Sequence, residues 1–132
     1  MPYARISLQR GVTPDYLRAL SASVYQAMHE AFEVPVGDCF QVIHQHDPGG
    51  LVFDRHYLGG PRSGALVLIA ITAGRVRSDA CKQAFYRRLV ELLAIAPGIA
   101  PEDVMVNIVT TAAQDWSFGG GRAGIVAAQA QA

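Results

Sequence analysis

The chain has 132 residues, carries eleven basic and eleven acidic side chains, and is 51% hydrophobic. This length and composition are typical of one globular domain with a real hydrophobic core, and they exclude a fibrous or disordered chain. The charge is balanced and no basic stripe is interleaved with aromatic residues, so nothing supports a nucleic-acid partner.

Neither a membrane partner nor export is expected. No apolar run approaches the roughly 20 residues that a spanning helix needs, and the start Met-Pro-Tyr-Ala-Arg lacks the apolar stretch of a signal peptide. Cys39 and Cys81 form no CxxC pair or His-spaced cluster, which argues against a zinc site. These features predict a cytoplasmic protein in a reducing setting.

The first third of the sequence predicts a strand, a helix and a second strand. Residues 3–8 alternate apolar with polar side chains, and Thr13-Pro14 is typical of a helix start. Apolar residues then recur at three- and four-residue spacing through about residue 32. They form one helix face: Leu17, Leu20, Val24, Met28 and Ala31. A Pro-Gly break follows, and residues 39–44 are expected to form the second strand.

The same plan returns after a connector rich in glycine and proline, residues 45–65. Residues 66–72 predict an apolar strand, Ser78 is a helix N-cap, and residues 104–109 predict a final strand. The inner face of this second helix is expected to carry Phe85, Leu89, Leu92 and Leu93.

The two halves form an internal repeat with a constant offset of 65 residues, which pairs Thr13 with Ser78 and Asp38 with Asp103. We therefore expect one α+β domain: βαβ units at 2–44 and 66–109, the connector at 45–65, and a C-terminal arm at 110–132. A helical crossover makes the two strands of each unit parallel and places both helices on one face of a four-stranded sheet. The other face is left uncovered although the third strand is strongly apolar, which favours an oligomer.

Pro2 is the strongest candidate for a catalytic residue. Removal of the initiator methionine would leave Pro2 with a free secondary amine, which can act as a base, as a cationic acid, or as a nucleophile that forms an iminium. The alternative is a Met-Pro start without a chemical role. If Met1 is retained, Pro2 has no free amine.

Three charged residues are candidates to accompany Pro2. Arg75 and Arg77 alternate in a loop after the third strand and can hold one carboxylate through bidentate bonds, or they are two solvated loop arginines. Asp38 follows the Pro-Gly break and is either a site acid or a turn acid, the role expected for Asp103.

Other chemistry-bearing residues give weaker signals. His44 and His46 share one strand face but lack a third ligand, so no metal is predicted. His29 on the first helix is more typical of a solvated or core-edge histidine. The glycines after Phe118 lack the strand, lysine and helix of a phosphate-binding loop. No cofactor is therefore predicted.

Several stretches, taken in chain order, resemble the tautomerase superfamily and, within it, the malonate semialdehyde decarboxylase family. They are Val34-Pro35-Val36-Gly37-Asp38, Gln45-His46, Arg75-Val76-Arg77-Ser78, Lys82-Gln83-Ala84-Phe85-Tyr86, Gly98-Ile99-Ala100-Pro101-Glu102-Asp103 and Asp115-Trp116-Ser117-Phe118-Gly119. Any one of them is weak, but the ordered set spans nearly the whole chain and is specific.

The resemblance implies a tautomerase-like β-α-β fold and a homotrimer. It implies that Pro2 is the catalytic amine with Asp38 as its acidic companion, and that Arg75 and Arg77 bind the substrate carboxylate. Trp116 and Phe118 are then expected to form an apolar wall beside that carboxylate. His29 resembles the helical histidine of the cis-3-chloroacrylic acid dehalogenase branch.

The function that this set favours is decarboxylation of a small 3-oxo acid such as malonate semialdehyde, without a cofactor and with side tautomerase or hydratase activity. Two arginines lower the pKa of a nearby amine and a close aspartate raises it, so Asp38 favours the protonated amine that decarboxylation uses. Two alternatives stay open: a keto-enol tautomerase of 2-oxo acids of the phenylpyruvate type, and a non-catalytic trimeric binding protein of the same fold.

Overall fold

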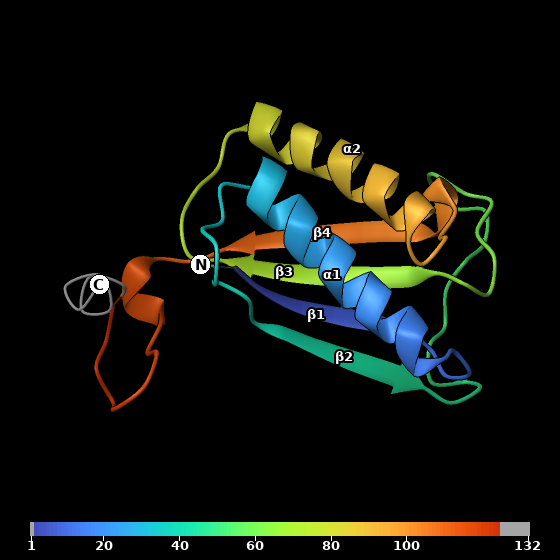
Figure 1. The fold of residues 1–132 in the computed structure, drawn as a ribbon, viewed down its shortest axis with the longest axis horizontal. Coiled ribbons are helices and arrows are strands. Elements are labelled where there is room, and N and C mark those ends of the chain that lie inside the picture. Colours follow the sequence, from blue (N-terminus) through green and yellow to red (C-terminus); the bar gives the residue numbers. More distant parts are fainter. Residues whose placement is uncertain (1, 125–132) are drawn as a thin grey trace.

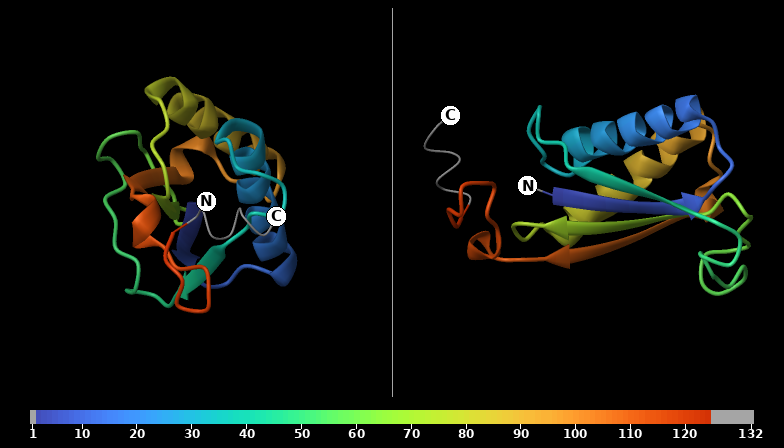
Figure 2. Two further views of the ribbon diagram at one scale, coloured as in Figure 1. Left: turned by 90° about the vertical axis from the view of Figure 1, so that its left-hand side faces the viewer. Right: turned by 90° about the horizontal axis from the view of Figure 1, so that it is seen from below.

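The computed structural model describes residues 2–124 and shows a four-stranded sheet with both helices on one face (Figures 1 and 2). The elements are β1 (Pro2–Gln9), α1 (Pro14–Ala31), β2 (Gln41–His46), β3 (Val67–Ala73), α2 (Asp79–Ile95) and β4 (Val104–Thr110). The predicted α+β class, with two strand-helix-strand units, is confirmed. None of the helices in the described part of the chain is both long and apolar enough to cross a membrane.

Both helices begin at the predicted caps. The Thr13 hydroxyl accepts a hydrogen bond from Tyr16 N at 3.1 Å, and the Ser78 hydroxyl accepts one from Cys81 N at 3.1 Å. Each bond satisfies one of the first backbone N–H groups of a helix, which have no partner inside the helix. The repeat is therefore visible in the geometry of the two helix starts as well as in the sequence.

The strand order is β2-β1-β3-β4. Strand β1 is parallel to β2 and β3 is parallel to β4, as the two crossovers require, while β1 and β3 are antiparallel. This central antiparallel pairing sets Pro2 opposite Ala73, at the beginning of β1 and the end of β3. The C-terminus of α1 lies at the same end of the sheet (Figure 1).

The second strand begins two residues later than the sequence pattern predicted, at Gln41 instead of residue 39. A turn ends at Asp38, whose N–H donates to Pro35 O at 3.2 Å. Phe40 O then accepts from Ala4 N at 3.0 Å, immediately before the first paired residue of the strand. The turn and this first contact therefore occupy the two residues that alternation alone assigned to the strand.

The core lies between the sheet and the helices. Alternate residues of β1 and β3 face the helices and are buried, namely Ala4, Ile6, Leu8, Val67, Ile69, Ile71 and Ala73. The helices contribute the predicted inner faces, with Leu20, Val24, Met28, Phe85, Leu89, Leu92 and Leu93 buried. Each large side chain buried here adds roughly 1.5–3 kcal/mol of hydrophobic stabilisation.

The other face of the sheet carries no helix (Figure 2). Val42, Met105 and Val109 on this face are 37%, 47% and 52% exposed in the single chain. The connector lies on this side, at the end of the sheet away from Pro2 (Figure 2). The face is thus open and partly apolar, as the sequence predicted.

Candidate functional site

Pro2 lies buried at the first position of β1, opposite the last residue of β3 in the sheet register. Ala73 opposite it is also the attachment point of the C-terminal arm, because Ala73 O accepts from Thr111 N at 2.8 Å and from Thr111 Oγ1 at 3.1 Å. Met1, on whose removal the predicted amine depends, lies outside the described residues.

Asp38 closes the turn that leads from α1 into β2, and both of its carboxylate oxygens are inaccessible to solvent. Helix α1 holds this turn at two points. The Tyr25 hydroxyl accepts from Gly37 N at 2.9 Å, and His29 Nδ1 donates to Val34 O at 2.9 Å. The Tyr25 and His29 rings are nearly parallel, with centroids 6.4 Å apart. The histidine that the sequence singled out therefore supports the backbone next to Asp38.

Arg77 is buried on the aromatic ring at the end of α1. Its guanidinium carbon lies 4.1 Å from the centre of the Phe32 ring, and Nε donates to Phe32 O at 2.7 Å. Nη1 donates to Arg75 O at 3.2 Å, while Nη2 is buried with no hydrogen-bond partner among the described residues. Burial, followed by the neighbouring charge of Arg75, lowers the pKa of the guanidinium. A bound anion would offset both effects.

Arg75 is held differently, on the surface. Its Nη1 lies 3.2 Å from Glu33 Oε1, and its Nη2 donates to Glu33 O at 3.3 Å. The two arginines thus share a loop but not an environment: one is buried against an aromatic ring and one is exposed and paired with a carboxylate. Both are anchored on backbone carbonyls at the C-terminus of α1, where the helix dipole favours cations.

The arm lies at the same end of the sheet (Figure 1). Trp116 Nε1 donates to Thr111 Oγ1 at 2.7 Å, and the Trp116 and Phe118 rings stack with centroids 5.5 Å apart. Phe118 in turn contacts Phe40, with centroids 6.3 Å apart. Phe40, Trp116 and Phe118 form what we call the aromatic cluster. The predicted arm is described as far as residue 124.

The structure therefore brings Pro2, Asp38, the arginine loop and the arm, each on a separate segment, to one end of the sheet. Sequence reasoning missed Glu33, Tyr25, Phe40 and Thr111, which hold these groups in place. Only Glu33 could have been noticed in the sequence, because it is an acidic residue immediately after a helix, where glycine is the usual residue.

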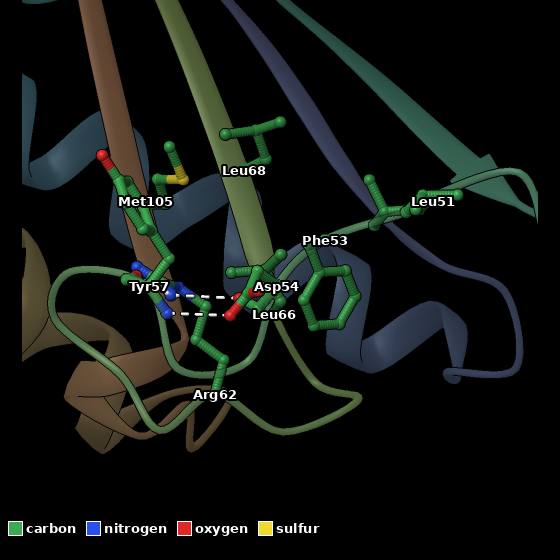
Figure 3. Close-up of a pocket in the computed structure, with 9 residues that line it drawn as sticks. Leu51, Phe53, Asp54, Tyr57, Arg62, Leu66, Leu68 and Met105 are labelled. Carbon is green, nitrogen blue, oxygen red and sulfur yellow. Dashed lines mark hydrogen bonds between the residues drawn. The ribbon is translucent and has the colours of Figure 1, made fainter.

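The opposite end of the sheet carries a separate cavity of about 260 Å³ between the connector and the helix-free face (Figure 3). Leu51, Phe53, Leu68 and Met105 give it apolar walls. The charged group at its rim is already engaged, because the Arg62 guanidinium donates to the backbone carbonyls of Asp54, Tyr57 and Leu58. This cavity offers no free cation for a carboxylate and none of the predicted site residues.

The remaining metal candidates do not form a centre. His44 and His46 lie on the helix-free face with their rings 6.3 Å apart. Among residues 2–124, no three His, Cys, Asp or Glu side chains come together as possible metal ligands.

Known proteins resemble this chain over almost its whole length. Two family models, each described as a tautomerase enzyme, match residues 2–59 and 38–119, the second of which is more than half of the chain. The probable tautomerase YusQ of Bacillus subtilis (strain 168) is 34% identical over 126 residues, which cover 96% of this chain and 99% of the relative. The probable tautomerase YrdN of the same organism is 37% identical over 123 residues, covering 93% and 95%.

Solved structures of malonate semialdehyde decarboxylase superpose closely. One is 37% identical with a TM-score of 0.89, covering 96% of this chain and 98% of that one. A second, of the FG41 enzyme inhibited by 3-bromopropiolate, is 32% identical with a TM-score of 0.87, covering 96% of both chains. A fused 4-OT trimer, 17% identical with a TM-score of 0.77 over 95% of this chain and 98% of that one, shares the fold.

Proposed function

This chain belongs to the tautomerase family of enzymes, and we propose that it decarboxylates a small 3-oxo acid such as malonate semialdehyde without a cofactor. The observation that carries the proposal is the buried guanidinium of Arg77. Its Nη2 is buried without a hydrogen-bond partner among residues 2–124 and can donate to an anion, and Arg77 lies in the loop that follows the strand paired with Pro2. The likeness to malonate semialdehyde decarboxylase at 37% identity supports the same reaction.

In the proposed reaction, Arg75 and Arg77 hold the substrate carboxylate. Charge-assisted bonds from guanidinium groups orient the carboxylate so that the breaking C–C bond aligns with the π system of the substrate carbonyl. The bond between the carboxylate carbon and C2 breaks, carbon dioxide leaves, and the electron pair forms the C2–C3 double bond of an enolate.

Pro2 supplies the electron sink. The protonated amine can hydrogen-bond to the carbonyl oxygen and neutralise the charge that develops there, or the neutral amine can form an iminium that accepts the electrons covalently. On the first route, proton addition at C2 of the enolate gives acetaldehyde. On the second route, iminium formation releases one water, C–C bond breaking gives an enamine, and protonation at C2 followed by hydrolysis with one water releases acetaldehyde and the Pro2 amine. Either route consumes one proton for each carbon dioxide released. Asp38 steadies the cationic amine or positions a water.

The aromatic cluster provides the apolar wall in this proposal. The stacked rings of Trp116 and Phe118 favour the uncharged product over the carboxylate anion, because an anion loses hydration beside apolar surface. Thr111 holds this wall against Ala73, the residue opposite Pro2.

We further propose that the enzyme is a cytoplasmic homotrimer. The helix-free face exposes Val42, Met105 and Val109, and association of chains would remove this apolar surface from water. A fused 4-OT of the same fold is a trimer. Cys39 and Cys81 are both free thiols, which fits a reducing compartment.

A second activity, keto-enol tautomerisation of a 2-oxo acid, has a specific observation in its favour. Both Bacillus relatives are named as probable tautomerases. That reaction requires Pro2 as a free base, which the nearby positive charge of the arginines favours. The protonation state of Pro2 therefore separates the two activities.

Two measurements test the proposal. Mass spectrometry of the mature chain must show that Met1 is absent, since a retained methionine removes the amine from every version of the mechanism. Turnover of malonate semialdehyde is then compared with turnover of phenylenolpyruvate in the wild type, Pro2→Ala and Arg75→Ala. We expect Pro2→Ala to abolish decarboxylation and Arg75→Ala to lower kcat/KM by about 10- to 100-fold, the loss of one or two charge-assisted bonds.

The matched control is Arg10→Ala, an exposed arginine that pairs with Asp47 at the far end of the sheet and should leave kcat/KM unchanged. If the wild type turns over phenylenolpyruvate but not malonate semialdehyde, the decarboxylase proposal is wrong and the tautomerase alternative is favoured. Unchanged rates in Pro2→Ala would contradict both proposals.

A further inference from the structure

Glu33 occupies a backbone conformation that its side chain disfavours. It directly follows Phe32, the C-cap of α1, and has a φ of 57°, in the left-handed region. Glycine is the usual residue after a helix because a Cβ makes this conformation costly. A strained residue beside a site is a reason to ask what its side chain does there.

The Glu33 carboxylate contacts the exposed member of the arginine pair. Oε1 lies 3.2 Å from Arg75 Nη1, and the Glu33 carbonyl accepts from Arg75 Nη2 at 3.3 Å. Glu33 therefore binds the Arg75 guanidinium through both its side chain and its backbone carbonyl. The side chains of Glu33 and Arg75 are 56% and 54% exposed, so the pair lies open to solvent and to a ligand.

A substrate carboxylate has the same chemistry as the Glu33 side chain. Both are planar anions that accept from guanidinium N–H groups, and two of them cannot take the same donor in the same place. An exposed ion pair of this kind shifts an equilibrium by up to about fivefold, so an incoming carboxylate can displace it at small cost. The backbone bond from Arg75 to the Glu33 carbonyl does not depend on the side chain and would keep the guanidinium in place.

We propose that Glu33 is a positioning residue that lowers the affinity of the site for carboxylates: its own carboxylate occupies Arg75 in the empty site and is exchanged for the carboxylate of the substrate. This inference rests on the proposed role of Arg75 in substrate binding. Glu33 acts through Arg75 and takes no part in bond breaking. It weakens the binding of every small carboxylate by about the same factor, so it lowers the affinity of the site for carboxylates and leaves their relative affinities unchanged.

The test separates binding from chemistry. Glu33→Gln removes the charge and keeps the size and backbone of the residue. We expect KM for malonate semialdehyde to fall two- to fivefold with kcat unchanged, and the Kd of propionate, a carboxylate without a reacting carbonyl, to fall by the same factor in an NMR titration. The matched control is Glu30→Gln, which removes a carboxylate of α1 that pairs with Arg88 of α2, and it should alter neither constant.

An unchanged or raised KM and Kd in Glu33→Gln overturns the inference, because Glu33 would then be a bystander or a support for Arg75. Propionate binding keeps this failure distinct from failure of the proposed function. If propionate binding depends on Arg75 and tightens in Glu33→Gln while no 3-oxo acid is decarboxylated, the exchange stands and the decarboxylase proposal falls. If decarboxylation occurs and Glu33→Gln behaves as the wild type, the decarboxylase proposal stands and the carboxylate exchange is wrong.

Discussion

Replacing Thr111 by valine should release the arm from the sheet. The Thr111 hydroxyl accepts from Trp116 Nε1 at 2.7 Å and donates to Ala73 O at 3.1 Å, so it joins the aromatic cluster to the strand end opposite Pro2. Valine has nearly the same shape but offers neither bond. The backbone bond from Thr111 N to Ala73 O, at 2.8 Å, is kept, so the substitution tests the side chain alone.

The size of the effect follows from the two lost bonds. Each contributes about 0.5–1.5 kcal/mol, so docking of the arm weakens by about 2 kcal/mol, or roughly 30-fold in its equilibrium constant. We expect kcat/KM to fall by about tenfold, which is less than the roughly 30-fold change in the docking equilibrium of the arm. Trp116 is the only tryptophan of the chain, so its fluorescence reports directly on the arm, and acrylamide should quench it more strongly in Thr111→Val.

The adjacent Thr110 provides the matched control. It is exposed at the end of β4, and Thr110→Val should change neither the quenching nor kcat/KM. The reasoning is refuted if Thr111→Val quenches and turns over substrate as the wild type does. Lower activity with unchanged quenching would also contradict it, because the effect would then not pass through Trp116.

Three further predictions concern stability. Asp103 is buried and accepts from Ser63 N at 2.6 Å and Ser63 Oγ at 2.5 Å, so Asp103→Ala should lower the free energy of unfolding in urea by about 3 kcal/mol; a loss below 1 kcal/mol would contradict this anchoring role. A hydrogen bond from Arg88 lowers the pKa of Glu30 from 4.5. A carboxyl group whose pKa is lower in the folded than in the unfolded chain stabilises the fold at pH values above its unfolded pKa. This stabilisation is lost as the pH falls through the folded pKa. The Tm of the wild type should therefore exceed that of Glu30→Gln at pH 7, and the difference should shrink as the pH falls below 4.5; a constant difference would argue against the ion pair. Glu33→Gly should be more stable than Glu33→Gln by about 1 kcal/mol in urea denaturation, since glycine adopts the left-handed backbone freely; equal stabilities would show that the conformation is unstrained.

Local patterns made much of the fold predictable. The apolar spacing of α1 and α2 and the caps Thr13 and Ser78 depend on neighbouring residues along the chain, and each appears where the sequence placed it. The repeat then determined that two parallel units were present, because a helical crossover allows no other pairing within a unit. The start of β2 was wrong by two residues because its first contact, from Ala4 to Phe40, is made with a distant strand.

The sequence named candidate residues for the site but did not specify how they are arranged in space. Pro2, Asp38 and the two arginines stand out by residue type, spacing and resemblance, which are properties of the sequence. Their meeting at one end of the sheet depends on the antiparallel pairing of β1 with β3, and neither unit specifies that pairing by itself.

By itself, the sequence determined the two strand-helix-strand units, their caps and their buried faces, and it named the candidate site residues. Only the tertiary structure decided that Arg77 is buried on Phe32 while Arg75 is exposed on Glu33, and that Thr111 attaches the arm opposite Pro2. The physical reason is the range of the interactions. Helix caps and periodic faces join residues a few positions apart, whereas the contacts that shape this site join residues far apart in the chain, such as Arg77 with Phe32 and Phe40 with Phe118.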